Sequence, residues 1–487
     1  MNRSAIAWAL PAFLFLGCAS PKNDPPPPTP SPAPVALLPA WEREPASVPD
    51  GTVVDATKLH RATLDNGLRL IMLQDRRLPY VSLGITVASG ASSEELSQAG
   101  VAQFTAELME RGAGARDTLA LAETMDALGA RFGVGSGWDT TTVSVSGLSG
   151  DLTVLLEVLR DLVLDPRLPR DEAERVRAEQ LAALESDKDS PRTLGARAFA
   201  RTLYPDHRYG LPSSGTPETV KRLSARDARA FYDKIFVPRD AVFFASGNID
   251  IAALSESARS LFGGWEDREP LAKPAPPPAE APEATRVVIV DRPDLGQAQI
   301  LVGHEGIART DDRRIPAALT NLVLGGSGFS SRLMQKIRAE EGLTYSVSSY
   351  FTLRHNPGPF VMSTFTRVPE TRRVVDILLA ELARLQTDPP AGAELRDAKT
   401  LSTGRFALSL ETPSAVTSSL VDLTIAELPD DSLDTYRTRV RNVSEADTAA
   451  IANTLLHPDR VAIVVVGPAA ELEPQLNDLG PVEIQTP

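Results

Sequence analysis

Two proline-rich segments constrain the fold of this chain more than any other feature. Residues 18–50 contain the run PKNDPPPPTPSPAP, and residues 269–285 contain the run PLAKPAPPPAEAP. Proline lacks a backbone N–H and holds φ near −65°, so segments this rich in proline are typical of extended linkers rather than of helix or sheet. They predict two folded domains of about 200 residues each, at residues 51–268 and 286–487.

The first 17 residues have the pattern of a secretory signal peptide. Arg3 precedes an apolar run at residues 5–16, which is shorter than the roughly 20 residues of a membrane-spanning helix. The run ends in Leu-Gly-Cys, and Cys18 is the only cysteine of the chain. This resembles a bacterial lipobox, in which the cysteine is lipidated, so we expect an envelope protein anchored by Cys18. Ala19 favours the outer membrane, facing the periplasm. The alternative is an ordinary cleaved signal peptide with a chance cysteine.

Charge and cysteine content exclude two classes of function. Asp and Glu total 64 against 50 for Lys and Arg, which gives a net charge of −14. Such a chain repels phosphate backbones, so nucleic acid is not an expected partner. A single cysteine also excludes an intramolecular disulfide and zinc sites of the C-x-x-C type.

Both predicted domains mix strands and helices. In the first domain, TLDNGLRLIMLQ, YVSLGITVASG and DTTTVSVSG predict strands. Apolar residues at a spacing of three and four predict helices over residues 101–109, from Thr118 as N-cap to Leu128, and over DLTVLLEVLRDLVLDP. The second domain repeats the order, with VVIVD and AQILVGHEG as strands, a helix at residues 315–324 and the glycine-rich turn GGSGFSSRL. This order predicts an α+β protein with a duplicated fold.

The helix in GVAQFTAELMERG has the layout of the inverted zinc motif H-x-x-E-H without its ligands. In that motif two histidines hold the metal and the glutamate activates water. Gln103 and Glu107 stand at the two histidine positions, and Ala106 stands at the glutamate position. A hydrolytic zinc centre needs three protein ligands, an open position and a base, so these residues predict that the chain holds no zinc.

Four stretches make the chain similar to the M16 family of insulinase, pitrilysin and processing peptidases in its two-domain form. They are LDNGLRL, GVAQFTAELMERG, YPDHRYGLPSSG and GGSGFSSRLMQKIRAEEGLTYSV, and the likeness extends from about residue 59 to about residue 482. The resemblance implies two homologous M16/LuxS-like metallohydrolase domains, each an antiparallel sheet with helices on one face. It also implies a third zinc ligand on a later helix, and Ala183 stands at that position.

The second domain retains another part of the family's active site. Members use an Arg and a Tyr seven residues apart to hold the substrate carbonyl, and Arg338 and Tyr345 have this spacing in IRAEEGLTY. Taken alone, such a pair is as readily explained by surface packing. Gly325, Gly326 and Gly328 precede the pair and resemble a substrate-binding loop, although a simple turn explains glycines there nearly as well.

Substrate in this family adds as a strand to a sheet edge. That edge is expected near GVGSGWDTTTVSV, where Gly133, Gly135 and Gly137 leave room for a second backbone or form an ordinary bulge.

Other metal sites are less favoured. Gln103, Glu107 and Glu110 share a helix face and Glu179 lies one turn before Ala183, so an oxygen-rich cation site is conceivable, but a solvated acidic face is the better interpretation. The five histidines are dispersed along the chain and have no pair at helical spacing: His60, His207, His304, His355 and His457.

We therefore expect a subunit that is inactive alone and completes a peptidase with a zinc-bearing M16-like partner, acting on unfolded peptides. Zinc is expected in that partner and no cofactor in this chain. A peptide-binding or scaffold protein of the cell envelope is the alternative, and an autonomous zinc protease is disfavoured because every ligand position is substituted.

Overall fold

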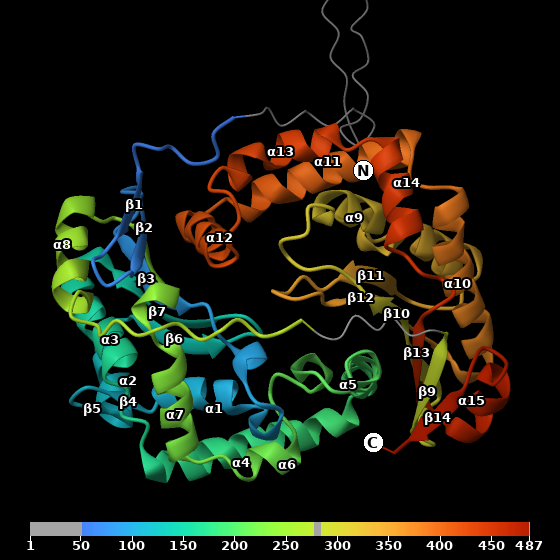
Figure 1. Ribbon diagram of the computed structural model, residues 1–487, viewed down its shortest axis with the longest axis horizontal. Helices are drawn as coiled ribbons and strands as arrows, with labels where there is room; N and C mark the ends of the chain where they lie inside the picture. Colours follow the sequence, from blue (N-terminus) through green and yellow to red (C-terminus); the bar gives the residue numbers. More distant parts are fainter. Residues whose placement is uncertain (1–50, 277–283, 487) are drawn as a thin grey trace, which may run out of the picture. The chain divides into compact units, whose positions relative to one another are not determined.

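Two six-stranded sheets organise the computed structural model, which describes residues 51–276 and 284–486 (Figure 1). The first sheet has the spatial order β1 (Leu59–Thr63), β2 (Arg69–Gln74), β8 (Ala241–Gly247), β3 (Tyr80–Val87), β7 (Thr141–Leu148) and β6 (Arg131–Ser136). The second sheet has the order β11 (Val347–Phe351), β12 (Pro359–Arg367), β10 (Gln297–Glu305), β13 (Ala462–Gly467), β9 (Arg286–Asp291) and β14 (Val482–Gln485).

The two sheets have corresponding strand orders, as a duplicated fold requires. The first sheet has the order β2, β8, β3, β7, β6, and the second sheet has the matching order β9, β13, β10, β12, β11. The sheets are mixed, which corrects the expectation of antiparallel sheets. Strands β2 and β8 are parallel, and so are the pairs β13–β9 and β9–β14. A parallel pair needs a long crossover connection, and the helices between β2 and β8 supply one.

Each sheet is covered on both faces, whereas helices were expected on one face only. Alternate residues of β8 show this directly, because Phe243 lies in the core of the first half and Phe244 lies in a separate cluster with Val416 and Leu420. Those two residues belong to α12 (Pro413–Ile425), a helix of the second half. The face of the first sheet that points away from its own core helices is therefore covered by the other half of the chain.

The second sheet is covered in the reciprocal way. Strand β13 shows the same alternation, because Ile463 and Val465 face the core of the second half. Val464 and Val466 face Phe199 instead, in α5 (Pro191–Leu203) of the first half. Strands buried on both faces are hydrophobic throughout, which explains the continuous apolar run AIVVV.

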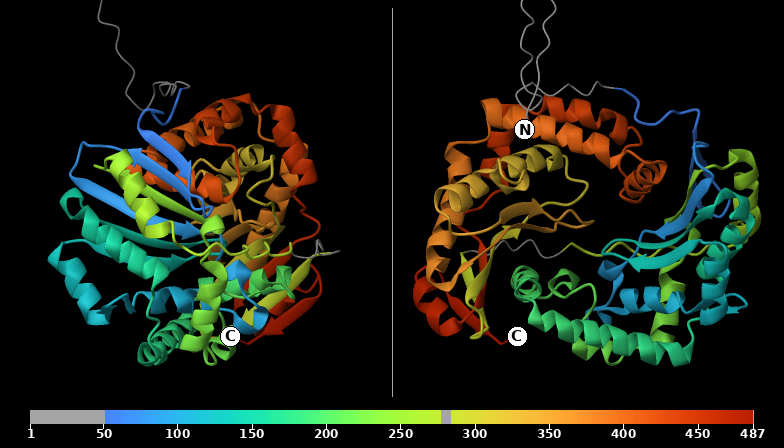
Figure 2. Two further views of the ribbon diagram at one scale, coloured as in Figure 1. Left: turned by 60° about the vertical axis from the view of Figure 1, so that its left-hand side comes forward. Right: turned by 180° about the vertical axis from the view of Figure 1, so that it is seen from behind.

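The remaining helices pack on the outward faces of the sheets and around their ends (Figure 2). In the first half they are α1 (Val101–Met109), α2 (Thr118–Ala127), α3 (Leu152–Leu164), α4 (Arg170–Ser186), α6 (Pro217–Val220), α7 (Ala225–Ile235) and α8 (Ile251–Phe262), with a short pair β4 (Gly112–Ala113) and β5 (Arg116–Asp117). In the second half they are α9 (Arg314–Asn321), α10 (Thr371–Thr387), α11 (Gly392–Ser409), α13 (Ser432–Asn442), α14 (Glu445–Thr454) and α15 (Ala469–Leu476).

Local predictions agree with these elements, with two corrections. The N-cap of α2 is Asp117 rather than Thr118, because its carboxylate accepts the backbone N–H of Ala120 at 2.9 Å. The predicted helix at residues 315–324 ends as α9 at Asn321 and continues as a π-helical turn to Gly326.

The predicted signal peptide, Cys18 and the first linker lie outside the described residues, as does part of the second linker at residues 277–283. Among the helices that are described, none has the length and apolar character needed to cross a membrane.

Candidate functional site

A buried ion pair holds the first turn of α1, the helix that carries the degenerate zinc motif. Glu94 accepts the backbone N–H groups of Gly100 and Ala102 at 2.9 and 2.7 Å, and the Arg208 guanidinium lies 2.6 Å from the same carboxylate. The N–H groups of a first turn lack intrahelical partners, so a carboxylate stabilises them. Burial raises the pKa of Glu94, while Arg208 and both N–H groups oppose that shift. Arg208 comes from the YPDHRYG stretch, which therefore positions α1.

Two of the three motif positions of α1 are hydrogen-bonded to each other. The Gln103 amide donates to the Glu107 carboxylate over 2.8 Å. Ala106 is buried and offers only a methyl group, so the position of the catalytic base has no group that exchanges protons.

The Glu179 carboxylate, which lies near α1, is paired with two arginines. Arg111 donates to Glu179 of α4 over 2.8 Å, and Arg175 donates to the other oxygen of Glu179 over 3.0 Å. Burial raises the pKa of Glu107, the Gln103 amide opposes that shift, and the charge of Glu179 adds to it. Ala183 lies one turn beyond Glu179 on α4 and is exposed. A guanidinium thus supplies the positive charge beside these carboxylates.

This set of donors does not fit zinc. Zinc in proteins takes imidazole, thiolate or carboxylate ligands in a convergent tetrahedral set, and an amide and a methyl group are not substitutes. Across residues 51–276 and 284–486, no group of three or more His, Cys, Asp or Glu side chains is arranged to hold a metal ion. The oxygen-rich alternative lacks convergence as well, since Glu110 accepts the backbone N–H of Val134 at 2.7 Å and Glu179 is held by arginines.

The histidines do not assemble into a site. The rings of His304 and His457 lie 5.2 Å apart, and the backbone N–H of His457 donates to Nε2 of His304 over 3.2 Å. Nδ1 of His304 lies 2.7 Å from the carbonyl of Glu305, so the neutral Nδ1–H tautomer satisfies both contacts. His207 packs edge-on against Tyr209. These are structural contacts of buried or half-buried rings.

Arg338 and Tyr345 are in contact. The guanidinium carbon of Arg338 lies 4.8 Å from the centre of the Tyr345 ring and 4.5 Å from the centre of the Phe329 ring. Both rings project into solvent, because Tyr345 is 85% exposed and Phe329 is 69% exposed. No carboxylate among the described residues pairs with this guanidinium, so its donors remain available to a ligand. We call these three residues the Arg338 cluster.

Phe329 was not singled out from the sequence. It lies in GGSGFSSRL, where the glycines drew attention, and the one available signal was an aromatic residue in a glycine- and serine-rich turn. The cluster forms because Arg338 projects from a π-helical segment, Met334–Glu340, which follows this turn.

Packing accounts for the three glycines of this turn. A Cβ on Gly325 would lie 2.7 Å from the backbone nitrogen of Ser349 in β11, and a Cβ on Gly326 would lie 2.7 Å from the Asn321 amide. Gly328 has φ of +81°, in the left-handed region that favours glycine. Packing and backbone conformation are thus sufficient to explain these glycines, and their contact with substrate remains a prediction.

Strand β6 lies at an edge of the first sheet, as the resemblance to the M16 family implies. A Cβ on Gly135 would meet open space, and one on Gly137 would make only ordinary contact with Thr140. The edge is partly occupied, however, because the N–H of Val134 is accepted by Glu110. One backbone donor of the edge is thus already satisfied by a side chain of the same domain.

An arginine stacked on aromatic rings joins the two halves of the chain beside the YPDHRYG stretch. The guanidinium carbon of Arg354 lies 4.0 Å from the Trp138 ring centre and 4.4 Å from that of Tyr209. Asp139, next to Trp138, accepts the backbone N–H of His355 at 2.8 Å. This cluster was not predicted, since its members are separated by up to 216 positions in the sequence.

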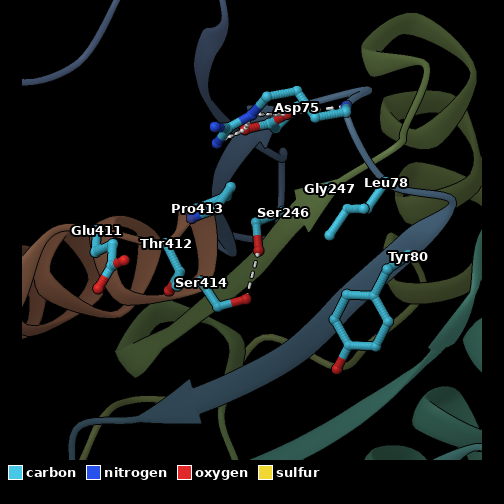
Figure 3. A pocket seen from close by; sticks show the side chains of 10 residues that line it. Asp75, Leu78, Tyr80, Ser246, Gly247, Glu411, Thr412, Pro413 and Ser414 are labelled. Atoms are coloured by element: carbon cyan, nitrogen blue, oxygen red, sulfur yellow. Dashed lines mark hydrogen bonds and ion pairs between the residues drawn. The ribbon is translucent and has the colours of Figure 1, made fainter. Parts of the chain in front are cut away.

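A cavity of about 600 Å³ lies where the turn after β2 and the end of β8 meet the start of α12 (Figure 3). The hydroxyls of Ser246 and Ser414 are 3.3 Å apart across it, and its one arginine, Arg77, is paired with Asp75. Leu78 and Tyr80 supply apolar wall. None of the residues predicted to form the site lines this cavity.

Comparison with known proteins places the chain in a family. The model for insulinase-type M16 peptidases matches residues 69–216, and the model for the M16 inactive domain matches residues 222–402. An uncharacterized zinc protease of Streptomyces coelicolor is 28% identical over 416 residues, which cover 84% of this chain and 90% of the relative. The uncharacterized zinc protease YmxG of Bacillus subtilis is 24% identical over 357 residues, 73% of this chain and 86% of the relative.

Solved structures agree. A peptidase M16 inactive domain from Pseudomonas fluorescens superposes with a TM-score of 0.78 at 26% identity, covering 84% of this chain and 98% of that one. A protease from Helicobacter pylori superposes with a TM-score of 0.77 at 18% identity, covering 84% and 100%, which is a likeness in fold. The two family models together span most of the chain, the fold is that of M16 proteins, and the zinc-motif positions are substituted. The chain is a degenerate two-domain member of the M16 peptidase family.

Proposed function

We propose that this chain is an M16 subunit that does not hydrolyse peptides alone and that supplies Arg338 and Tyr345 to a zinc-bearing partner subunit. The observation that carries the proposal is the contrast between its two half-sites. The α1 positions have lost the donors that zinc requires, whereas Arg338 and Tyr345 are in contact, and the described residues place no competing carboxylate on the guanidinium.

The proposed task of the pair is to hold the carbonyl of the peptide bond that is cleaved. A guanidinium N–H and a phenol O–H both donate hydrogen bonds, and negative charge that develops on the carbonyl oxygen strengthens them. Contact with two rings restricts the Arg338 side chain, which lowers the entropy that is lost when substrate binds. The hydrolytic water and its base belong to the partner in this proposal.

Substrate is proposed to be an unfolded peptide that adds as a strand to an edge such as β6. Support comes from the edge position of β6 and the open space beside Gly135. Backbone hydrogen bonds would then supply affinity with little dependence on sequence.

Two other functions are distinguishable. A scaffold or peptide-binding protein of the envelope has no need of an available Arg338 cluster, so the cluster favours the catalytic subunit. The relatives named as zinc proteases suggest an autonomous enzyme, which conflicts with the amide and methyl groups of Gln103 and Ala106.

The location is proposed to be the cell envelope, with Cys18 lipidated and the protein facing the periplasm. The support is the signal-like N-terminus and the position of the only cysteine. Cys18→Ser should move the protein from the membrane fraction to the soluble periplasmic fraction or leave an unprocessed precursor, and unchanged membrane association would disprove the assignment.

The central experiment mixes variants of this chain with a zinc-bearing M16 subunit from the same genome. Arg338→Ala and Tyr345→Phe should each form a normal heterodimer on gel filtration and lower kcat about 10²- to 10³-fold. Arg396→Ala is the matched control, because Arg396 is an exposed arginine of α11 outside the Arg338 cluster. Activity of both variants within twofold of wild type would remove the catalytic role and favour the scaffold.

A further inference from the structure

A cavity of about 650 Å³ in the second half of the chain differs in character from the rest of the molecule. It lies between α9, β11, α11 and α13, and three arginines line it: Arg314, Arg405 and Arg439. None of its lining residues is Asp or Glu, in a chain whose net charge is −14. We call it the arginine pocket.

The three arginines have unusually little compensation. Arg314 donates to the carbonyl of Asp311 at 3.3 Å, and Arg405 donates to the carbonyl of Gly326 at 3.3 Å. No ion pair within the described residues neutralises any of the three, in contrast to the neighbouring Arg313, which pairs with Asp311. Burial lowers the pKa of Arg314 and the charge of Arg439 lowers it further, while nearby aspartates oppose the shift. Like charges in one pocket cost free energy unless an anion joins them.

Two aromatic rings form part of the wall and are held in place. The Phe406 and Tyr436 rings lie 4.4 Å apart, and the Tyr436 hydroxyl hydrogen-bonds the Ser402 hydroxyl at 2.9 Å. Apolar side chains, among them Leu433 and Ile315, complete the lining. A ligand that fills this pocket therefore needs an anionic group next to an apolar body.

The arginine pocket is continuous with elements already described. Its lining includes Ser349 and Tyr350 of β11, the edge strand of the second sheet, and Gly326 of the turn that leads to Phe329. The Asn321 amide donates to the Ser349 carbonyl over 3.0 Å, so this edge is partly occupied, and an extended peptide that passes it would be held mainly by the side-chain pocket.

We propose that the arginine pocket binds a carboxylate that adjoins an aromatic or aliphatic side chain of a bound peptide, so that acidic–apolar segments are the preferred substrate class. This rests on the proposed function, since it assumes that the chain binds extended peptides. The carboxylate comes either from an internal Glu or Asp or from the peptide C-terminus, and guanidinium groups recognise both.

The test uses the purified chain and ten-residue peptides that carry an uncharged BODIPY label, with binding followed by anisotropy. One peptide carries a central Phe-Glu and an amidated C-terminus, a second has Gln in place of Glu, and a third has Gln and a free C-terminal carboxylate. We expect at least one carboxylate peptide to bind about tenfold more tightly than the peptide without a carboxylate. Tighter binding of the first peptide identifies an internal Glu as the source of the carboxylate, and tighter binding of the third identifies the peptide C-terminus.

Variants assign the preference to the pocket. Arg314→Gln and Arg439→Gln should abolish it, and the exposed Arg405→Gln should reduce it without affecting the fold. Arg396→Gln, on the surface of α11 outside the pocket, should leave it unchanged. Thermal unfolding of each variant reports whether it is folded.

Two outcomes overturn the inference and differ in what they say of the proposed function. Equal, measurable affinity for all three peptides would exclude carboxylate recognition and leave peptide binding intact. Absence of binding to all three peptides would exclude carboxylate recognition by the pocket and peptide binding by the chain alone. The role of Arg338 in the heterodimer would still be tested separately, by kcat of the Arg338→Ala variant.

Discussion

Arg338 and Tyr345 are in contact across seven residues of sequence, with the guanidinium carbon 4.8 Å from the ring centre. Phe329 contacts the same guanidinium at 4.5 Å. A cation over an aromatic ring at an exposed site contributes about 0.5–1 kcal/mol. The Phe329 ring is therefore a positioning group, which helps to hold the Arg338 guanidinium against Tyr345.

Replacement of Phe329 should impair turnover mildly. Phe329→Ala removes one of the two rings that restrict Arg338, so kcat of the heterodimer is expected to fall about two- to fivefold, far less than for Arg338→Ala. Phe329→Tyr retains a ring and should restore the wild-type value. Equal rates for Phe329→Ala and wild type would show that Tyr345 alone is sufficient to position the guanidinium.

Zinc content should distinguish this chain from an autonomous protease. After dialysis, elemental analysis is expected to find well under one zinc per molecule, because the three ligand positions hold the Gln103 amide, the Glu107 carboxylate that is bonded to this amide, and the Ala183 methyl group. Gln103→His should change nothing, since one imidazole does not complete a ligand set. Stoichiometric zinc whose removal by chelator abolishes peptidase activity of the isolated chain would contradict the proposed function.

Removal of Glu110 should strengthen peptide binding at β6. Its carboxylate accepts the N–H of Val134, a donor that an added strand would use. Glu110→Ala releases that donor, and one net hydrogen bond of about 1 kcal/mol corresponds to roughly fivefold tighter binding. Anisotropy with the labelled peptides measures the change. Glu110→Gln keeps an acceptor and serves as the control, and unchanged or weaker binding to Glu110→Ala would place the peptide on another edge.

His304 should make the fold sensitive to mild acid. Burial lowers its pKa to about 4, whereas the ring titrates near its ordinary value once unfolded. The unfolded state therefore binds the proton first, and the stability present above about pH 6.5 is lost as pH falls toward 4. At pH 5 the loss from this one group is about 2 kcal/mol.

Urea unfolding at pH 7.5 and pH 5 measures this contribution. Wild type and His304→Gln share all other titrating groups, so the variant should lose about 2 kcal/mol less between the two pH values. His207 also has a pKa lowered by burial and acts in both proteins alike. His457 contacts His304, so the same comparison is made in the His457→Gln background. Identical pH dependence of the two proteins would mean that the His304 ring is not kept neutral.

Local chemistry is what the sequence determined by itself. Helical and strand periodicities identified α3, β3 and β7 because each depends on residues a few positions apart. The loss of the zinc ligands could also be recognised from the sequence, because an amide is a poor zinc ligand and a methyl group is none in any fold. The edge strand beside Gly135 was expected from the resemblance to the M16 family.

Relationships across long sequence separations were decided only by the tertiary structure. Apolar runs such as that of β8 required cover on both faces, but nothing in them indicated that α12 of the other half supplies it. Packing of distant segments also brings Arg314, Arg405 and Arg439 into one pocket. The contact of Glu110 with Val134 and that of Phe329 with Arg338 span fewer residues, but they too depend on side-chain packing that periodicity does not report. Sequence periodicity reports which face of an element is buried, and only the packed chain determines which partner buries it.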